Sequence, residues 1–393
     1  MSILSNTPQC IPFENRVQLF RNFIRIDRSQ YCDESRGISI KVFRQRLLED
    51  GFSQLRKFTC SQLKQTVRVK FVDQFGSEEI GIDQNGIFKE FMEDICKQAF
   101  STEFGLFKTT LDGNVTPFLN SVVHDEHLQL FEFIGRMMGK ALYEGIVIDI
   151  PFALYIYAKL LGRYNYMDDL PSLDPELYRS LTFIKDYEGD CSDLGLDFTI
   201  SQDIFGHVTN VEIKPGGAHI PLTNDNVFEY IHLMADFRLN QECKDQFQAF
   251  ICGFRSIIQD QWLHIFSPME LQWLMSGENS KLDIKDLRMH TRYEGGYFDL
   301  HRTIRNFWAV LGEFTPKDQS AFLKYVTSCS KVRFFIEGIS ETKMIKSTFW
   351  NADRLPTART CFNLLKLPSY SKKSTLYKKL LYAIQYGAGF DLS

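Results

Sequence analysis

The stretch Leu355-Pro356-Thr357-Ala358-Arg359-Thr360-Cys361-Phe362-Asn363, near the end of this 393-residue chain, is the part of the sequence that decides the fold. It sets a cysteine in a polar segment that begins at a proline. Most cysteines in intracellular proteins are small buried hydrophobes, but this setting is an awkward one for a core residue. Arg359 favours the thiolate form electrostatically. We therefore expect Cys361 to be a reactive nucleophile, in a loop that leans on the amphipathic helix predicted by Leu376, Leu380, Leu381 and Ile384.

A cysteine hydrolase is the enzyme class that competes most directly for this nucleophile. Hydrolysis needs a base, usually a histidine within about 3 Å of the sulfur, and no histidine follows Cys361 in the chain. His290 and His301 precede it and are able to reach back in space, so the hydrolase hypothesis is weakened but stays open. Exchange between a thiol and a thioester replaces one thiolate by another of similar basicity and needs no strong base. The residues therefore favour acyl relay over hydrolysis.

Two further motifs follow the cysteine at fixed spacing. Leu367-Pro368-Ser369-Tyr370 comes first, and Gly389-Phe390 stands close to the C-terminus. Together with the cysteine motif they resemble the catalytic segment of the HECT ubiquitin ligases. The resemblance runs from about Arg16 to Ser393, and it includes the acidic turn entering a helix at 81–91, the helix at 135–141 and the small-lobe entry at 293–297.

The resemblance implies an α+β protein built as a two-lobed HECT domain. A large, mostly helical N-lobe is expected over 1–276, and a small α+β insertion at about 163–235 is expected to bind a conjugating enzyme. A small α/β C-lobe over 281–393 is expected to bear the catalytic Cys361. A short polar stretch with a glycine interrupts the apolar pattern at 275–280, which composition alone explains equally well as a domain boundary or a loop. The resemblance favours the boundary, because the family's hinge between the lobes falls here, at 277–280.

Hydrophobic periodicity gives a coarse secondary structure without the resemblance. Helical periodicity covers 40–65, and strict alternation at Val67–Val72 predicts a half-buried strand. Gly135 and Gly139, four residues apart in an apolar helix, predict close helix packing rather than dimerisation in a membrane. Within the insertion, two predicted strands at 198–200 and 210–213 precede a hairpin signal, Lys214-Pro215-Gly216-Gly217.

The function that the resemblance implies is ubiquitin transfer. Cys361 would take ubiquitin from a ubiquitin-conjugating enzyme as a thioester and pass it to a lysine of a protein substrate. By position, the family's conjugating-enzyme groove falls on Ser180, Leu181, Ile184, Tyr187, Tyr230 and Met234. Tyr230 and Met234 are four residues apart and share one helix face, and methionine with aromatics makes an adaptable pocket. Ordinary core packing is the competing interpretation of each of these residues.

Other positions acquire roles from the same resemblance. Arg359 and Thr360 directly precede the nucleophile and are assigned to the catalytic site. Gly277 and Asn279 belong to the hinge that allows the small lobe to move. Phe390 matches a family anchor that packs the tail against a lobe. Because a substrate lysine is protonated at neutral pH, it must lose a proton before it attacks. The carboxylate of Asp391 or of the C-terminal Ser393 is expected to orient that lysine and accept the proton.

Composition excludes several other classes of protein. The nine cysteines are odd in number, scattered and without a C-x-x-C pair, which disfavours a disulfide framework and a zinc site and indicates a reducing compartment, the cytoplasm or the nucleus. A net charge of −4 without a dominant basic stripe gives nucleic-acid binding little support. No phosphate-binding loop occurs, so no cofactor is expected. No apolar run is long enough to cross a bilayer, so no membrane partner is expected.

The one motif that gathers potential metal ligands is His124-Asp125-Glu126-His127. Its two histidines lack the spacing of a helical zinc pair, and its acidic residues suit the first turn of a helix that begins near Leu128. We therefore expect a helix start there and no metal site.

Two departures from the family pattern support an alternative of another class, a catalytically weak or inactive HECT-fold protein that binds ubiquitin or acts as a scaffold. The segment 331–350, KVRFFIEGISETKMIKSTFW, replaces the strand usual after Cys329, and Arg359 stands where relatives often have His or Ser. Family members generally carry recognition modules before the catalytic domain. This chain is therefore expected to be a fragment or to borrow specificity from a partner.

Overall fold

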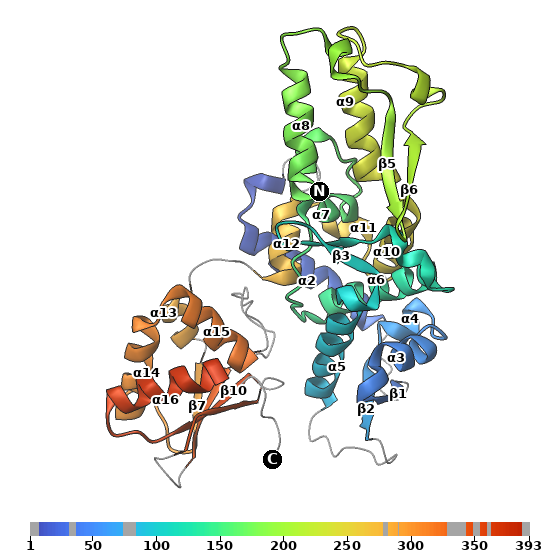
Figure 1. Cartoon of the computed structure of the whole chain (residues 1–393). Coiled ribbons are helices and arrows are strands. Elements are labelled where there is room, and N and C mark those ends of the chain that lie inside the picture. Colours follow the sequence, from blue (N-terminus) through green and yellow to red (C-terminus); the bar gives the residue numbers. More distant parts are fainter. Residues whose placement is uncertain are drawn as a thin grey trace. The chain divides into compact units, whose positions relative to one another are not determined.

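The structure is a computed structural model that divides the chain into two units (Figure 1). The first unit comprises most of Met1–Gln272, and the second is built mainly from Trp273–Ser393. The expected hinge at 277–280 comes a few residues after this division and stays a prediction. The residues that the structure describes are 8–30, 37–73, 84–277, 282–289, 291–327, 343–348, 354–359 and 363–386.

The first unit begins with an amphipathic helix, α2 (Phe13–Ser29), which follows a short 3-10 turn at Pro8–Cys10. Its apolar face is buried, and the Phe20 ring lies 5.7 Å from that of Phe266 in an edge-on arrangement. Arg16, on the same face, forms an ion pair with Glu270 and donates to the carbonyl of Ile265 at 2.6 Å. A buried guanidinium is tolerated only because those acceptors replace water.

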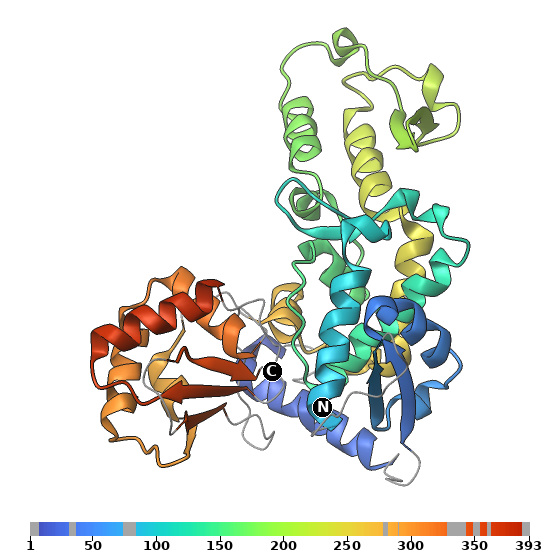
Figure 2. The ribbon, with the colours of Figure 1, turned by 60° about the horizontal axis from the view of Figure 1, so that its bottom comes forward.

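Two parallel strands, β1 (Ile38–Phe43) and β2 (Val67–Val72), lie side by side in the first unit (Figure 2). The alternation at 67–72 is confirmed as a strand with one buried face. The helical prediction for 40–65 is wrong at its start, because residues 38–43 alternate between buried and exposed positions with a period of two. Helices α3 (Leu47–Leu55) and α4 (Cys60–Leu63) form the crossover that parallel strands require.

The centre of the first unit is the packing of α6 (His127–Glu144) against α10 (Lys244–Ile257). A Cβ atom added to Gly135 would lie 2.0 Å from the Phe250 carbonyl oxygen, and one added to Gly253 would lie 1.8 Å from that of Glu132. The two helix backbones therefore touch where glycines stand. This confirms the close packing predicted from Gly135 and Gly139.

The remaining elements of the helical body follow the expected pattern with small shifts of boundary. Within the described ranges, no helix combines the length and the apolar character needed to cross a membrane. These elements are α5 (Gln84–Ala99), η4 (Thr102–Phe104), β3 (Phe107–Thr109), β4 (Val115–Pro117), η5 (Leu119–Val123), α7 (Leu154–Leu160), α11 (Asp260–Leu263) and α12 (Pro268–Ser276).

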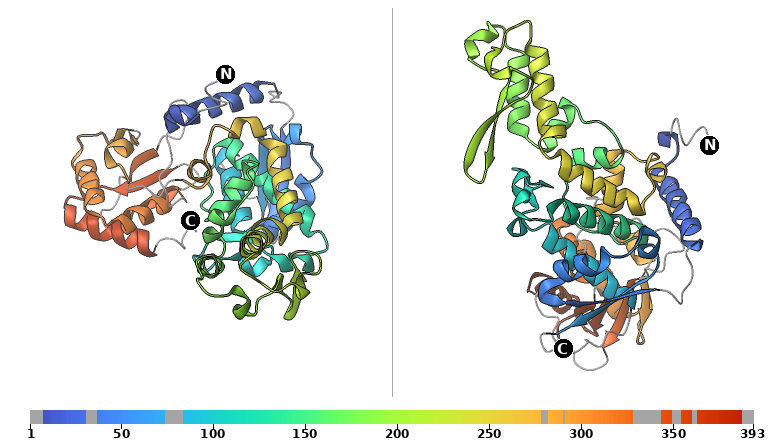
Figure 3. Two further views of the ribbon diagram at one scale, coloured as in Figure 1. Left: turned by 90° about the horizontal axis from the view of Figure 1, so that it is seen from above. Right: turned by 90° about the vertical axis from the view of Figure 1, so that its right-hand side faces the viewer.

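The insertion begins after α7 and contains two helices that run side by side, α8 (Pro175–Lys185) and α9 (Val227–Asp236), with a β-hairpin beside them (Figure 3). Asp174 caps α8 by accepting from the Leu177 amide, and Pro175 fills the first turn, where its missing N–H costs nothing. The short elements around them are η6 (Met167–Ser172), η7 (Cys191–Leu194) and η8 (Gly217–His219).

The hairpin joins β5 (Thr199–Ile204) to β6 (His207–Glu212), so the two predicted strands pair with each other. The turn is Phe205-Gly206, and the hairpin predicted at Lys214-Pro215-Gly216-Gly217 is wrong: that sequence leads into η8. After α9, a π-helical turn, η9 (Phe237–Gln241), returns the chain to α10.

The second unit is a four-stranded sheet covered by helices. Strands β7 (Thr291–Glu294), β8 (Lys343–Thr348) and β10 (Leu364–Pro368) are parallel, in the order β7-β8-β10, and β9 (Thr357–Arg359) pairs antiparallel with β10 at the edge. Part of the divergent segment 331–350 is thus a regular strand. The helices are α13 (Ile284–Met289), α14 (Arg302–Glu313), α15 (Pro316–Thr327) and α16 (Lys373–Tyr386).

Candidate functional site

The cysteine motif lies where β9 turns back into β10. Arg359 and Leu364 are paired across the two strands, so the residues between them, Cys361 included, form the connection of a β-hairpin. Asn363 has a positive φ of 49° and is buried, a backbone conformation that asparagine tolerates better than most residues. Thr360 and Cys361 themselves, and the side chain of Arg359, lie outside what the structure describes.

The strands around this connection are firmly held. The Tyr325 hydroxyl donates to the Pro356 carbonyl at 2.6 Å, immediately before β9. On the other side, Leu364, Leu365 and Leu367 of β10 are buried in the core of the second unit. The predicted amphipathic pattern of the last helix is confirmed, because α16 buries Leu376, Leu380 and Ile384. The strands on either side of the connection are therefore anchored to the core of the second unit.

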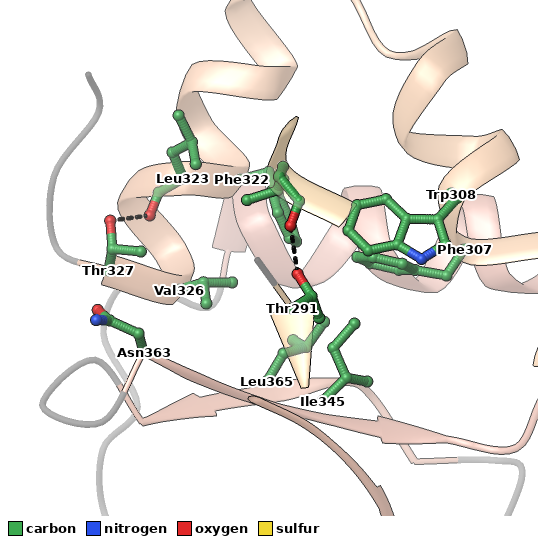
Figure 4. A pocket seen from close by; sticks show the side chains of 11 residues that line it. Thr291, Phe307, Trp308, Phe322, Leu323, Val326, Thr327, Ile345, Asn363 and Leu365 are labelled. Carbon is green, nitrogen blue, oxygen red and sulfur yellow. Dashed lines mark hydrogen bonds between the residues drawn. The ribbon is translucent and has the colours of Figure 1, made fainter. Parts of the chain in front are cut away.

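A small cavity of about 20 Å³ lies beneath the hairpin, between α15 and the sheet (Figure 4). Its walls are apolar side chains, among them Phe322, Val326 and Leu365, with Asn363 at one end. The Thr327 hydroxyl donates to the Leu323 carbonyl at 2.8 Å, so its hydrogen is used within its own helix. A space of this size and polarity is a packing defect rather than a binding site.

The position of His301 bears on the hydrolase hypothesis. Its Nδ1 accepts from the Thr303 amide at 3.2 Å and caps α14. This helix follows the carboxyl end of β7, whereas Cys361 precedes the amino end of β10, and parallel strands put those at opposite ends of the sheet. The Tyr297 hydroxyl donates to the Leu367 carbonyl at 3.0 Å, which ties the loop before α14 to the far end of β10. These contacts tie His301 to the end of the sheet opposite Leu364, but Cys361 and His290 lie outside the described residues, so the hydrolase hypothesis stays open.

A second candidate site is an open groove of about 620 Å³ beside α8 in the insertion. Phe183 is its most exposed apolar wall, with 61% of its surface accessible, and Ile184, Leu194 and Leu196 supply further apolar lining. Of the predicted docking residues, Ser180 and Ile184 line the groove. Tyr187 is half-buried, with its ring 5.7 Å from that of Phe183.

Three of the six predicted docking residues face the interior instead. Leu181, Tyr230 and Met234 are buried, and the Tyr230 ring packs edge-on against Phe198 at 5.3 Å. Burial also raises the pKa of Tyr230. These residues support the groove rather than line it in this structure, so substitutions there are expected to disturb the insertion itself.

Phe183 is the residue that sequence reasoning missed. It lies on the exposed side of α8, and a bulky apolar residue between Thr182 and Ile184 looks in sequence like part of one buried run. The only sequence feature that could have indicated its exposure is that an amphipathic helix cannot bury both Ile184 and the adjacent Phe183.

The groove is lined by one acidic and one basic side chain, Glu176 and Arg179, but the segment after α8, which we call the rim, is acidic. Asp186, Glu188, Asp190 and Asp193 follow α8 and are exposed, and within the described part of the chain none of them forms an ion pair. The Ser192 amide donates to Asp190 at 2.9 Å and lowers the pKa of that carboxyl, so it stays charged. An apolar floor with a negative rim suits a partner that presents an apolar side chain among lysines or arginines.

Two other predicted positions have described surroundings. Gly277 ends α12 with a positive φ of 80°, and its amide donates to the Trp273 carbonyl at 2.9 Å. His127 begins α6, and His124 Nε2 lies 2.8 Å from the Phe104 carbonyl oxygen. The predicted hinge residue Asn279 and the tail residues Phe390 and Asp391 lie outside the described residues.

Comparison with known proteins identifies the class to which this fold and hairpin belong. Residues 93–393 match the family model of the HECT-domain (ubiquitin-transferase), and the chain belongs to that family. It is 45% identical to Ubiquitin-protein ligase E3B of Homo sapiens over its whole length, which is 40% of that protein. It is similarly 43% identical to E3 ubiquitin-protein ligase UPL6 of Arabidopsis thaliana and 36% identical to E3 ubiquitin-protein ligase HUL5 of Saccharomyces cerevisiae, covering 39% and 45% of them.

Membership in the family settles the fold and the enzyme class. The chain carries a HECT-type ubiquitin-transferase domain with the mixed α+β architecture expected from the cysteine motif. The chain spans about 40% of the length of the human relative, so the relatives' names describe proteins that are longer than this sequence.

Proposed function

We propose that this chain accepts ubiquitin from a ubiquitin-conjugating enzyme as a glycyl thioester on Cys361 and transfers it to lysines of protein substrates. The observation that carries the proposal is the position of the family's cysteine motif, on a short connection between β9 and the buried strand β10. Ubiquitin, a conjugating enzyme and a protein substrate are the partners. The chain itself holds the acyl group between the two transfers.

Each transfer is a substitution at the carbonyl carbon of ubiquitin's terminal glycine. In the first, the Cys361 thiolate attacks, a new C–S bond forms, and the conjugating enzyme's thiolate leaves. In the second, the lysine attacks as the neutral amine, a C–N bond forms, the C–S bond breaks, and the departing Cys361 thiolate takes the proton that the acylated nitrogen releases. Before it attacks, the lysine ammonium must lose its first proton. Asp391 or the C-terminal carboxylate accepts that proton, and Phe390 holds the tail in place. Arg359 favours the thiolate form of Cys361, both before it attacks and when it leaves, and Thr360 is the residue beside it.

Docking of the conjugating enzyme is assigned to the groove beside α8. Ser180 and Ile184 line it together with Phe183, and the Tyr187 ring packs on that of Phe183, whereas Leu181, Tyr230 and Met234 support it from within. Because Cys361 must meet first the docked enzyme and then the substrate, the segment with Gly277 and Asn279 acts as the hinge between the two transfers. The reaction takes place in the cytoplasm or the nucleus, where free thiols persist.

The test is a single-turnover reaction of the chain with activating enzyme, conjugating enzyme and ubiquitin, resolved on a non-reducing gel. We expect an adduct of chain and ubiquitin that disappears with thiol reagent. Cys361→Ala should abolish it, a loss of at least about a hundredfold, while Cys252→Ala, which removes an exposed cysteine of the first unit, should leave it unchanged. A correctly folded chain that forms no adduct would instead be the scaffold of the alternative hypothesis.

A further inference from the structure

Three large apolar side chains are exposed along one edge of the second unit. Met289, at the end of α13, is 75% exposed, and Phe298 and Leu300, in the loop between β7 and α14, are 57% and 72% exposed. We call these three residues the edge patch. Single exposed apolar residues are common on protein surfaces, but three large ones on two neighbouring segments need an explanation.

The loop that carries the edge patch is held in one conformation. Arg288 donates to both carboxylate oxygens of Asp299, at 2.7 and 2.8 Å, and so joins the end of α13 to the loop. The Tyr293 hydroxyl donates to Asp299 at 3.2 Å and accepts from Trp308 Nε1 at 2.9 Å. Gly295 and Gly296 have positive φ angles of 67° and 90°, which allow the tight turn out of β7. A partner that binds here meets a surface that is already ordered.

The edge patch lies among charges of both signs with a small basic excess, because residues 281–305 contain six lysines and arginines and four aspartates and glutamates. Lys285, Arg292, Arg302 and Arg305 are exposed, and among the described residues none of them has an ion-pair partner. The whole segment 281–393 contains 19 lysines and arginines and 10 aspartates and glutamates, a net charge of +9 in a chain whose net charge is −4. A negatively charged partner is therefore drawn towards this unit.

A symmetric dimer of the chain does not fit this surface. A stable dimer buries about 800 Å² on each partner, far more than three side chains provide. In a symmetric dimer each copy would also meet its own basic rim, so that like charges would face one another.

We propose that the edge patch is a docking site for an acidic peptide segment of a partner protein, one in which leucine or phenylalanine side chains are interspersed with aspartate and glutamate. The apolar side chains of the segment cover Met289, Phe298 and Leu300, and its carboxylates face Arg302 and Arg305. Binding does not involve Cys361, so the proposal goes beyond the transfer reaction and does not depend on it. Its effect is to bring a bound protein to the lobe that holds the thioester.

The binding test uses the full chain and a fluorescein-labelled synthetic peptide of about 16 residues, with leucines and phenylalanines at i, i+3 and i+4 spacing and glutamates at the remaining positions. Fluorescence polarisation should show saturable binding that weakens at least threefold between 50 and 300 mM salt. The Phe298→Ser, Leu300→Ser double variant should weaken it at least tenfold. Leu111→Ser, at a site 76% exposed in the first unit, should not change it.

Charge is tested separately from apolar contact. Arg302→Glu with Arg305→Glu should weaken binding at least fivefold and remove most of the salt dependence, and a peptide with lysine in place of glutamate should bind at least tenfold more weakly. Met289→Gln lies outside the loop and repeats the apolar test if the loop variant loses its thermal transition.

Unchanged binding in both apolar variants, or preference for the basic peptide, overturns the proposal. So does a dimer of the parent chain that dissociates in the double variant, since the patch would then belong to a second copy. In every variant the Cys361 thioester should still form at the parent rate. A failure of thioester formation in the parent counts against the proposed transfer and leaves the peptide result standing.

Discussion

The insertion at 163–235 and the C-terminal segment at 281–393 carry opposite charges. The insertion contains 4 lysines and arginines and 13 aspartates and glutamates, a net charge of −9, whereas the C-terminal segment has a net charge of +9. Each also exposes apolar side chains within its charged surface, Phe183 beside the groove in one and the edge patch in the other. The net charge of −4 for the whole chain conceals this division.

The two surfaces are built from different kinds of element, and this determines which substitutions each accepts without loss of folding. The groove takes its exposed apolar residue from a regular helix, α8, whose opposite side packs on Tyr230 and its neighbours. The edge patch takes two of its three residues from a loop, fixed by the Arg288–Asp299 ion pair. Substitutions on the two sides of α8 can therefore separate effects on partner binding from effects on folding. At the edge patch this separation is harder, because the exposed residues belong to the loop itself.

The largest effect expected in the insertion comes from its interior. Tyr230→Ala removes a ring that is 4% exposed and packs against Phe198, so it should lower the free energy of unfolding by about 3 kcal/mol or more. Phe228→Ala, two residues earlier on the same helix and 68% exposed, is the matched control and should cost less than about 0.5 kcal/mol.

Urea denaturation gives both values, and hydrogen exchange locates the loss. Amides of α8, α9 and the β5–β6 hairpin should exchange faster in Tyr230→Ala, while those of α6 and α10 should keep their protection. If Tyr230→Ala is as stable as the parent, its ring is not a core element, and the earlier interpretation of Tyr230 as a direct docking residue regains its basis.

Some sequence features predicted the structure correctly and others did not, because each feature reports on a different physical property. The cysteine motif predicted the family and hence the fold, and glycines in α6 predicted a helix contact because only glycine permits it. Residues 38–43 were missed because a six-residue alternation beside a helical pattern is too short to separate the two periods. The β5–β6 turn was missed because Phe205 adopts a positive φ of 53°, which a bulky residue rarely does.

The groove shows a further limit of sequence patterns. Periodicity predicts that α8 and α9 each have an apolar side, but it does not say which apolar residues the neighbouring helix covers. Packing of α8 against α9 covers Leu181, Tyr230 and Met234 and leaves Phe183 exposed. That outcome depends on contacts between residues about 50 positions apart, which no local pattern contains.

A smaller effect on stability, with a clear effect on function, is expected from Phe183→Ala. The ring lines the groove and is 61% exposed, so its removal should leave the free energy of unfolding within about 0.5 kcal/mol of the parent. Loss of an exposed aromatic anchor at an interface should reduce the single-turnover rate of Cys361 charging about tenfold at subsaturating conjugating enzyme. Phe228→Ala again serves as the control and should charge normally. Normal charging of Phe183→Ala would place the docking surface elsewhere on the insertion.

The smallest effect expected is the one that tests the charge division itself. Asp186→Lys with Glu188→Lys reverses two exposed carboxylates on the rim of the groove without touching its apolar floor. Because rim charges act mainly on the rate of encounter, charging at 50 mM salt should slow about three- to fivefold, and the difference should vanish at 0.5 M salt, where such charges are screened within a few ångströms. Glu103→Lys with Asp112→Lys makes the same change of net charge at exposed sites on the helical body and is the control.

Equal slowing in both variants would mean that net charge alone steers the conjugating enzyme, whereas slowing in the rim variant alone assigns the effect to the groove. A deficit that persists at 0.5 M salt would instead mean that these carboxylates make direct contacts, and the groove would then recognise its partner by specific ion pairs rather than by its field.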